Sequence, residues 1–261
     1  MKRKIISPVL GIHCFFLAFG LLVLPCNGLA AGKANDVDAE VVWAASDGLR
    51  YELFDAVHKA GKWSEAVKIT DDNADNLHPC IDTAPDGRKW LVWTAIEQGG
   101  YEIRYSYTAE GEWRTPARLP SPLKSNIAPA LVVDENNVPW VVWAGNDGLH
   151  NDEIYFSRFV HGKWQQPALV NRPNNVPDIL PMITKLDRGK FQVTWQGYRG
   201  NRYVQLVSTW NGREWGPEQL LETVQDAEKS GTAKMKSSGR EIELPDFVPD
   251  NRQVFVRTYK K

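Results

Sequence analysis

Short runs of apolar residues alternate with short polar turns along most of the chain, and the runs have the length of β-strands. Residues 90–93 and 140–143 are apolar at every position, which is typical of strands buried on both faces. Residues 101–106 and 152–157 alternate between apolar and polar side chains, so one face of each strand should be wetter. Gly, Pro, Asn and Asp fill the turns between these runs. The pattern predicts an all-β protein.

The tryptophans show that these strands belong to a repeat of about 50 residues. The first set, spaced by 50, 50 and 52 residues, is Trp43, Trp93, Trp143 and Trp195. The second set, spaced by 50, 51 and 51 residues, is Trp63, Trp113, Trp164 and Trp215. Eight of the 11 tryptophans therefore mark one repeat, and Trp210 has no obvious repeat partner. Prolines at positions 79, 129 and 181 follow the same spacing.

Each repeat holds four short predicted strands, which is typical of a β-propeller blade. The sequence therefore predicts a β-propeller of four to five four-stranded blades. The expected repeats cover about 40–76, 77–126, 127–178 and 179–222, followed by a polar loop at 225–240 and a half-repeat at 243–259. The first repeat lacks its opening strand. Because residues 246–256 align with residues 82–92, we expect the half-repeat to pack against the first repeat and close the ring.

Residues 1–30 have the features of a secretory signal peptide, which leaves residues 31–261 as the propeller domain. Basic residues at positions 2–4 precede a largely apolar stretch, and small residues stand before a predicted cut after Ala30. An uncleaved membrane anchor and a lipoprotein acylated at Cys26 are the alternatives. We expect a secreted or periplasmic protein with no membrane span after signal cleavage.

The charge balance gives no reason to expect a nucleic-acid partner. The chain has 31 Lys and Arg against 32 Asp and Glu, with a pI of about 6.5. Nucleic-acid binding relies on clustered basic residues that would shift this balance. No phosphate-binding glycine loop occurs, and the histidines and Cys80 lack the spacing of a metal site. We therefore expect no cofactor and no metal.

A Ser-to-Trp spacing of seven residues recurs between the third and fourth predicted strands. The pairs are Ser106 and Trp113, Ser157 and Trp164, and Ser208 and Trp215. This pattern resembles the Asp-box, or BNR repeat, of sialidase-type β-propellers, which reads Ser-x-Asp-x-Gly-x-Thr-Trp. The Asp position holds Thr108, Phe159 and Trp210, so the resemblance is to a degenerate box. In that family the box is a structural turn, and we expect these serines and tryptophans to serve in packing.

The resemblance also implies a sialidase-like glycoside hydrolase as one possible activity. Sialidase catalysis in the family needs three arginines that grip a carboxylate, a Tyr activated by a Glu, and an Asp acid. The Arg-Ile-Pro motif that normally carries the first arginine does not occur in this chain. The sequence therefore favours binding over catalysis.

The strand order places the longer loops on one face of the propeller, where we expect any ligand site. These loops are residues 46–50, 71–78, 97–100, 121–128, 145–151, 171–180 and 197–202. The candidate ligand-binding residues are Asn76, His78, Asn126, Asp178, Arg199 and Arg202. Turn formation is the alternative role for the recurring Asn76, Asn126 and Asp178, and strand pairing is the alternative for the recurring Glu52, Glu102 and Glu153.

Together these features favour a non-catalytic propeller that binds a glycan or a protein ligand through its loop-rich face. A repeat with aromatic side chains and polar, Asn-rich loops suits sugar stacking and hydrogen bonding. A sialidase-like glycoside hydrolase and an oligomeric extracytoplasmic scaffold remain the alternatives.

Overall fold

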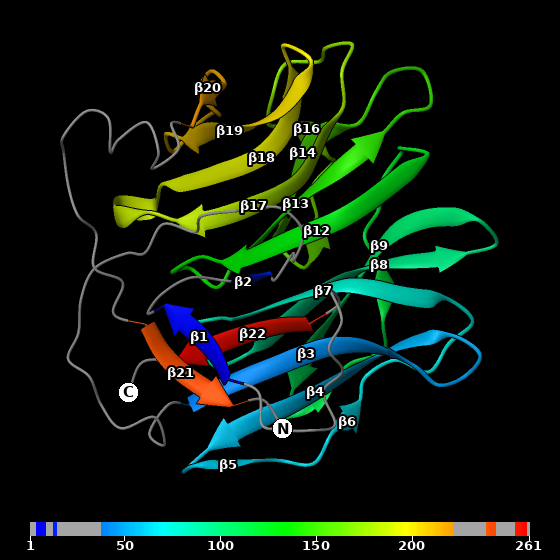
Figure 1. Cartoon of the computed structure of the whole chain (residues 1–261), viewed down its shortest axis with the longest axis vertical. Helices are drawn as coiled ribbons and strands as arrows, with labels where there is room; N and C mark the ends of the chain where they lie inside the picture. Colours follow the sequence, from blue (N-terminus) through cyan, green and yellow to red (C-terminus); the bar gives the residue numbers. More distant parts are fainter. Residues whose placement is uncertain (1–3, 9–12, 15–37, 222–238, 244–253, 260–261) are drawn as a thin grey trace.

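The computed structural model describes residues 4–8, 13–14, 38–221, 239–243 and 254–259, and strands dominate these residues (Figure 1). Most strands form four antiparallel meanders in chain order. The first meander contains β3 (Asp38–Ser46), β4 (Tyr51–Lys59), β5 (Lys62–Trp63) and β6 (Val67–Lys68). The second contains β7 (Asp75–Thr83), β8 (Lys89–Glu97), β9 (Gly100–Ala109), β10 (Glu112–Trp113) and β11 (Ala117–Arg118).

The third and fourth meanders repeat this order. The third contains β12 (Ser125–Val133), β13 (Pro139–Asn146), β14 (Glu153–Val160), β15 (Lys163–Trp164) and β16 (Ala168–Leu169). The fourth contains β17 (Asp178–Lys185), a 3₁₀ turn at Asp187–Gly189, β18 (Phe191–Arg199), β19 (Arg202–Trp210) and β20 (Gln219–Leu220). The chain is thus all-β with a β-propeller arrangement, as the sequence predicts, while the number of blades stays a prediction.

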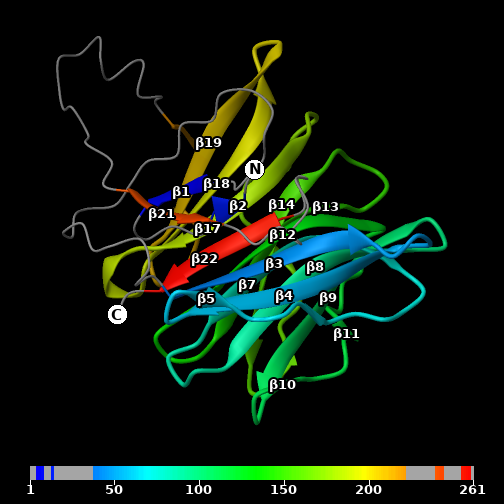
Figure 2. The same ribbon diagram turned by 60° about the horizontal axis from the view of Figure 1, so that its bottom comes forward.

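The C-terminal strand completes the first meander. Strand β22 (Val254–Tyr259) pairs antiparallel with β3, in the position that β7 holds beside β8, and it lies alongside β3 in both views (Figure 2). The predicted contact between the C-terminal segment and the first repeat is therefore present. Residues 244–253, which hold the rest of the predicted half-repeat, lie outside the described residues, as does most of the predicted polar loop.

Two short strands belong to the predicted signal segment. Strand β1 (Lys4–Pro8) pairs with β21 (Gly239–Glu243), and β2 (His13–Cys14) pairs with β22. The rest of residues 1–30 lies outside the described part of the chain, so the signal peptide stays a prediction. Among the described residues, no helix is long and apolar enough to cross a membrane.

The recurring prolines mark a bulge in the opening strands of the second, third and fourth meanders. The residues just before them, His78, Ala128 and Leu180, have φ values of 53°, 52° and 53°. At the same three places the pairing register shifts, for example between Leu77 and Cys80. Proline suits a bulge because it has no N–H to donate to the ladder. The repeated proline is therefore a backbone feature of the fold.

The first set of tryptophans forms the centre of the core. Trp93, Trp143 and Trp195 have no exposed surface, and Trp43 is 2% exposed. The fully apolar runs in β8 and β13 are buried on both faces, as predicted. Cys80 is buried as well, with its Sγ accepting a hydrogen bond from the backbone N–H of Leu131 at 3.3 Å.

The Ser-to-Trp segments form hairpins with a repeated serine contact. The buried hydroxyls of Ser106, Ser157 and Ser208 donate to backbone carbonyls eight residues later, at 2.5, 2.7 and 2.8 Å. In the second and third meanders, both central turn residues have positive φ, as at Glu110 and Gly111. That geometry belongs to type I′ turns and matches the twist of paired strands. The structural role predicted for these turns is confirmed, while their membership of the BNR family stays a prediction.

Candidate functional site

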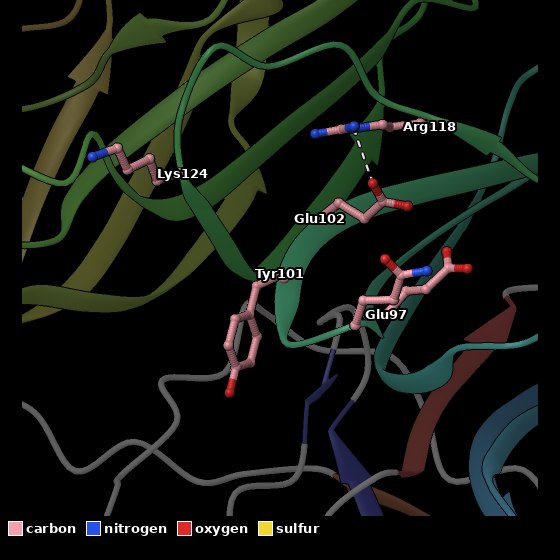
Figure 3. Close-up of a pocket in the computed structure, with 7 residues that line it drawn as sticks. Glu97, Tyr101, Glu102, Arg118 and Lys124 are labelled. Carbon is pink, nitrogen blue, oxygen red and sulfur yellow. Dashed lines mark ion pairs between the residues drawn. The ribbon is translucent and has the colours of Figure 1, made fainter.

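A hollow opens where the β8–β9 hairpin meets the connection from β11 to β12. Its volume is about 410 Å³. It is lined by Glu97, Gln98, Gly100, Tyr101, Glu102, Arg118 and Lys124 (Figure 3). Most of these residues come from two loops, 97–100 and 121–128, that the sequence places on the loop-rich face. We call this site the Tyr101 hollow.

Tyr101 gives the hollow an exposed aromatic ring. It is 42% exposed at the start of β9, where its backbone pairs with Ser125 of β12. This pairing joins the second and third meanders and fixes the position of the tyrosine. In Figure 3 the ring of Tyr101 points away from the ion pair between Arg118 and Glu102. The site therefore has a flat apolar surface at one side and charged groups at the other.

The two acidic residues of the hollow are held by Arg104 of β9. Its Nε lies 2.7 Å from Glu102 Oε1, and its Nη2 lies 2.6 Å from Glu97 Oε2. Its Nη1 lies 2.9 Å from Asp72 Oδ2, in the loop before β7. Burial alone would lower the pKa of Arg104, but its hydrogen bonds to Glu102 and Glu97 outweigh burial and raise it. Arg104 is therefore a fixed cation that positions both carboxylates.

The cations at the rim are more accessible. Arg118 Nε lies 3.0 Å from Glu102 Oε2, yet the Arg118 side chain is 59% exposed. Lys124 is exposed as well, and its backbone N–H donates to the Asn146 carbonyl at 2.8 Å. Arg118, Lys124 and Gln98 therefore offer hydrogen-bond donors to a ligand in the hollow.

The predicted residues Asn76 and Asn126 lie in the interior instead. Asn76 has no exposed surface, and its Oδ1 accepts a hydrogen bond from Trp93 Nε1 at 2.6 Å. Asn126 is 1% exposed and accepts from Trp143 Nε1 at 2.9 Å. Buried hydrogen-bond donors need a partner, and these two side-chain amides accept from the indole N–H groups of the tryptophan core.

The recurring glutamates are part of the same polar network. Glu52 accepts from the Thr70 hydroxyl at 2.5 Å and from Asn76 Nδ2 at 3.3 Å. Glu153 accepts from Asn171 Nδ2 at 2.6 Å, and the same amide also donates to Asp178 at 2.6 Å. Each of these glutamates therefore links one meander to the opening strand of the next.

Two buried carboxyl groups face each other between the third and fourth meanders. Asp178 has no exposed surface and Glu153 is 2% exposed. Burial is the main cause that raises the pKa of Glu153 to about 7; hydrogen bonds from Asn174 and Asn171 oppose the rise, and the charge of Asp178 adds to it. Arg199 Nη1 lies 3.2 Å from Asp178 Oδ1. The structure thus brings together two of the predicted residues, Asp178 and Arg199.

Besides Asp178, Arg199 also binds Glu218 at 3.0 Å. The other predicted residues lie apart from the pair of Asp178 and Arg199. Arg202 is exposed at the start of β19. His78 lies in the bulge of β7, and burial lowers its pKa. Within the described residues, no group of three or more His, Cys, Asp or Glu side chains could hold a metal ion.

The candidate residues predicted from the sequence do not include those that line the hollow. Glu102 stands out as a repeat position, whereas Tyr101, Arg118 and Lys124 are not among the predicted site residues. A usable signal existed, because Tyr51 and Tyr101 precede the recurring glutamates at a spacing of 50 residues. This tyrosine spacing is a weaker signal than the tryptophan pattern, which recurs in all four repeats.

No protein-family model and no curated protein sequence matches the chain. Solved structures do match. A protein of unknown function from Dyadobacter fermentans is 12% identical, with 71% of this chain and 70% of that chain covered and a TM-score of 0.56. A levansucrase from B. megaterium is 11% identical, with 72% and 67% covered and a TM-score of 0.50.

An exo-β-1,3-galactanase from Clostridium thermocellum is 12% identical, with a TM-score of 0.51. The match covers 75% of this chain and 47% of the galactanase chain, so this chain corresponds to about half of that enzyme. At such low identities the likeness concerns the fold alone. The comparisons support the β-propeller fold.

Proposed function

We propose that the protein is a secreted or periplasmic β-propeller that binds a glycan in the Tyr101 hollow without cleaving it. The observation that carries the proposal is an exposed tyrosine ring in one hollow with Arg118, Lys124 and Gln98. A sugar ring presents an apolar C–H face and a rim of hydroxyl groups. An aromatic surface beside a few fixed polar groups complements both features.

The balance of charge favours a neutral or weakly charged glycan. The hollow has two acidic residues, Glu97 and Glu102, and two basic residues, Arg118 and Lys124. Arg104 already binds both carboxylates. A strongly anionic ligand that approached Arg118 would also meet the negative charge of Glu102 beside it.

Hydrolysis is less well supported than binding. Arg104 and Arg199, two arginines that could grip a substrate carboxylate, are already bound to carboxylates of the chain itself. Glu153 has a pKa suited to a general acid, but it and Asp178 are buried where a substrate cannot reach them. Two solved structures with this fold are named as a levansucrase and a galactanase, which keeps a glycoside hydrolase as the rival proposal.

A glycan array combined with assays on fluorogenic glycosides, including sialosides, tests the proposal. We expect the purified protein to bind a restricted group of glycans on the array and to release no fluorophore. Enzymatic turnover would overturn the non-catalytic proposal in favour of the hydrolase. If the protein bound no glycan on the array and captured a protein ligand, glycan binding would be overturned in favour of the protein-binding alternative.

A further inference from the structure

The first meander carries a second set of the groups that line the Tyr101 hollow. The matching pairs, each 50 residues apart, are Tyr51 and Tyr101, Glu52 and Glu102, Asp47 and Glu97, and Lys68 and Arg118. Tyr51 is 41% exposed and Tyr101 is 42% exposed. The repeat has therefore preserved an accessible aromatic ring together with an acidic residue and a cation.

The sheet register places these groups in the same way in both meanders. Lys68 on β6 pairs with Phe54 of β4, just as Arg118 on β11 pairs with Arg104 of β9. The side chains repeat the contact as well. Lys68 Nζ lies 3.8 Å from Glu52 Oε1, against 3.0 Å between Arg118 Nε and Glu102 Oε2. The first meander thus reproduces the aromatic and ionic parts of the site.

The hairpin beside Tyr51 is held in shape by Asp47. Its Oδ1 accepts hydrogen bonds from the backbone N–H groups of Leu49 at 2.9 Å and Arg50 at 3.0 Å. The bond from Arg50, followed by that from Leu49, lowers the pKa of Asp47. The turn leaves the Leu49 side chain 93% exposed. Leu49 therefore adds an apolar edge next to Tyr51 that the second meander, with Gly99 at this position, lacks.

The other two meanders do not carry the set. In the third, Asp152 and Leu169 occupy the positions of the tyrosine and the cation. In the fourth, Tyr203 is 50% exposed, but Val204 and Leu220 replace the acidic residue and the cation. Among the described residues the full set thus occurs in the first and second meanders alone, and Tyr203 serves as an internal control.

Asp72 connects the two sets. Its Oδ2 accepts from Arg104 Nη1 at 2.9 Å, and Arg104 in turn holds the carboxylates of the Tyr101 hollow. The backbone carbonyl of Asp72 accepts from Arg50 Nη1 at 3.4 Å, in the hairpin next to Tyr51. This shared loop keeps the two sets at a fixed separation.

We infer that Tyr51, Asp47 and Lys68 form a second glycan site, with the buried Glu52 beneath Lys68 as a positioning residue, so that one chain binds two saccharide units at neighbouring blade boundaries. The inference rests on the proposed function of the Tyr101 hollow. A glycan that displays its sugars at the right separation gains affinity by engaging both sites at once.

Nuclear magnetic resonance titration with methyl glycosides of galactose, glucose, mannose and fucose tests the second site separately from glycan binding in the Tyr101 hollow. The ring signals of Tyr51 and Tyr101 should both shift with the same glycoside, while those of Tyr203 stay unchanged. If Tyr101 responds and Tyr51 does not, the second site is wrong and the proposed function stands. If neither responds, both are wrong.

Two matched variants add an independent measurement. Tyr51→Ala and Tyr101→Ala should each remove one set of shifts, leave the other, and reduce the stoichiometry from two to one. A polymer that displays the active glycoside should bind the wild type at least about tenfold more tightly than either variant. Unchanged polymer affinity in Tyr51→Ala would overturn the second site. Tyr203→Ala is the control. Because all three tyrosine rings are exposed, replacing any of them should leave the fold intact, so a loss of binding would not come from misfolding.

Discussion

The boundary between the first and second meanders has a buried ion pair at the position where the next two boundaries have clusters of aromatic rings. Between the second and third meanders, Trp90 lies 5.0 Å from Phe159 and 6.3 Å from Trp164, measured between ring centroids. Between the third and fourth, Trp140 lies 4.4 Å from Phe191 and 5.4 Å from Trp210. These clusters combine burial of large apolar surfaces with favourable ring geometry.

At the corresponding position of the first meander, the chain has Glu40. This glutamate has no exposed surface, and Lys89 Nζ lies 2.5 Å from its Oε1. Asp55 lies nearby; burial and the charge of Glu40 raise its pKa, while Lys89 opposes the rise. The same repeat position is therefore a tryptophan in two meanders and a buried, ion-paired glutamate in the first. The repeat determines where the side chain lies, but not which interaction stabilises the boundary.

The largest expected effect comes from the aromatic boundary. Trp140 is 3% exposed, so Trp140→Ala should lower the free energy of unfolding by about 3–5 kcal/mol. Urea unfolding followed by circular dichroism measures the loss. Leu149→Ala, at a side chain that is 83% exposed, should change stability by no more than about 0.5 kcal/mol. A loss similar to this control would show that the aromatic cluster does not stabilise the boundary.

Glu153 and Asp178 make the boundary between the third and fourth meanders sensitive to pH. The folded protein holds the Glu153 proton up to a pKa of about 7, against an ordinary value of 4.5. Its contribution is therefore fully present below about pH 4.5 and is lost as the pH rises through about 7, for a change of about 3 kcal/mol at most. Glu153→Gln, which resembles the protonated carboxyl, should remove that part of the pH dependence.

Unfolding free energies at about pH 5 and about pH 8 test this prediction. Asp55 contributes with the same sign because its pKa is also raised, so the difference between wild type and Glu153→Gln isolates Glu153. The exposed Glu112→Gln serves as control. Equal pH dependence in both variants would show that Glu153 titrates normally.

A smaller effect is expected at the ionic boundary. The Lys89 side chain is 29% exposed, so its pair with Glu40 lies between a surface pair and a buried one. Lys89→Met should cost about 1–3 kcal/mol, and the stability of the wild type should fall with salt more than that of Lys89→Met, which lacks the ion pair. Salt titration of urea unfolding measures this. A loss larger than that of Trp140→Ala would reverse the order of the two boundaries.

The sequence predicts the fold because a tryptophan every 50 residues is a one-dimensional signal that the blades preserve. Trp210, which had no repeat partner in the sequence, proves to belong to the aromatic cluster around Trp140, with Phe156 at 5.8 Å. Its position matches that of Phe159, which packs on Trp90 in the preceding meander. Phe159 and Trp210 are different residue types, so their equivalence is hidden in the sequence. The structure reveals it, because each ring packs on the tryptophan of the preceding meander.

The site is less predictable because it depends on contacts between strands that are distant in sequence. The recurrence of Asn76 and Asn126 is visible in the sequence, but their bonds to indole groups are not. Arg104 likewise gives no sign that it binds Glu97, Glu102 and Asp72 at once. Repeat spacing identifies equivalent positions, whereas burial and side-chain reach decide which of them can meet a ligand.

The affinity of the full chain for its best array glycan, compared between Tyr101→Ala and Tyr203→Ala, tests glycan binding in the Tyr101 hollow most directly. Loss of aromatic stacking should weaken binding at least about tenfold in Tyr101→Ala. Tyr203→Ala, which removes an equally accessible ring away from the hollow, should bind within about twofold of the wild type. Equal affinities of the two variants would contradict the proposed site.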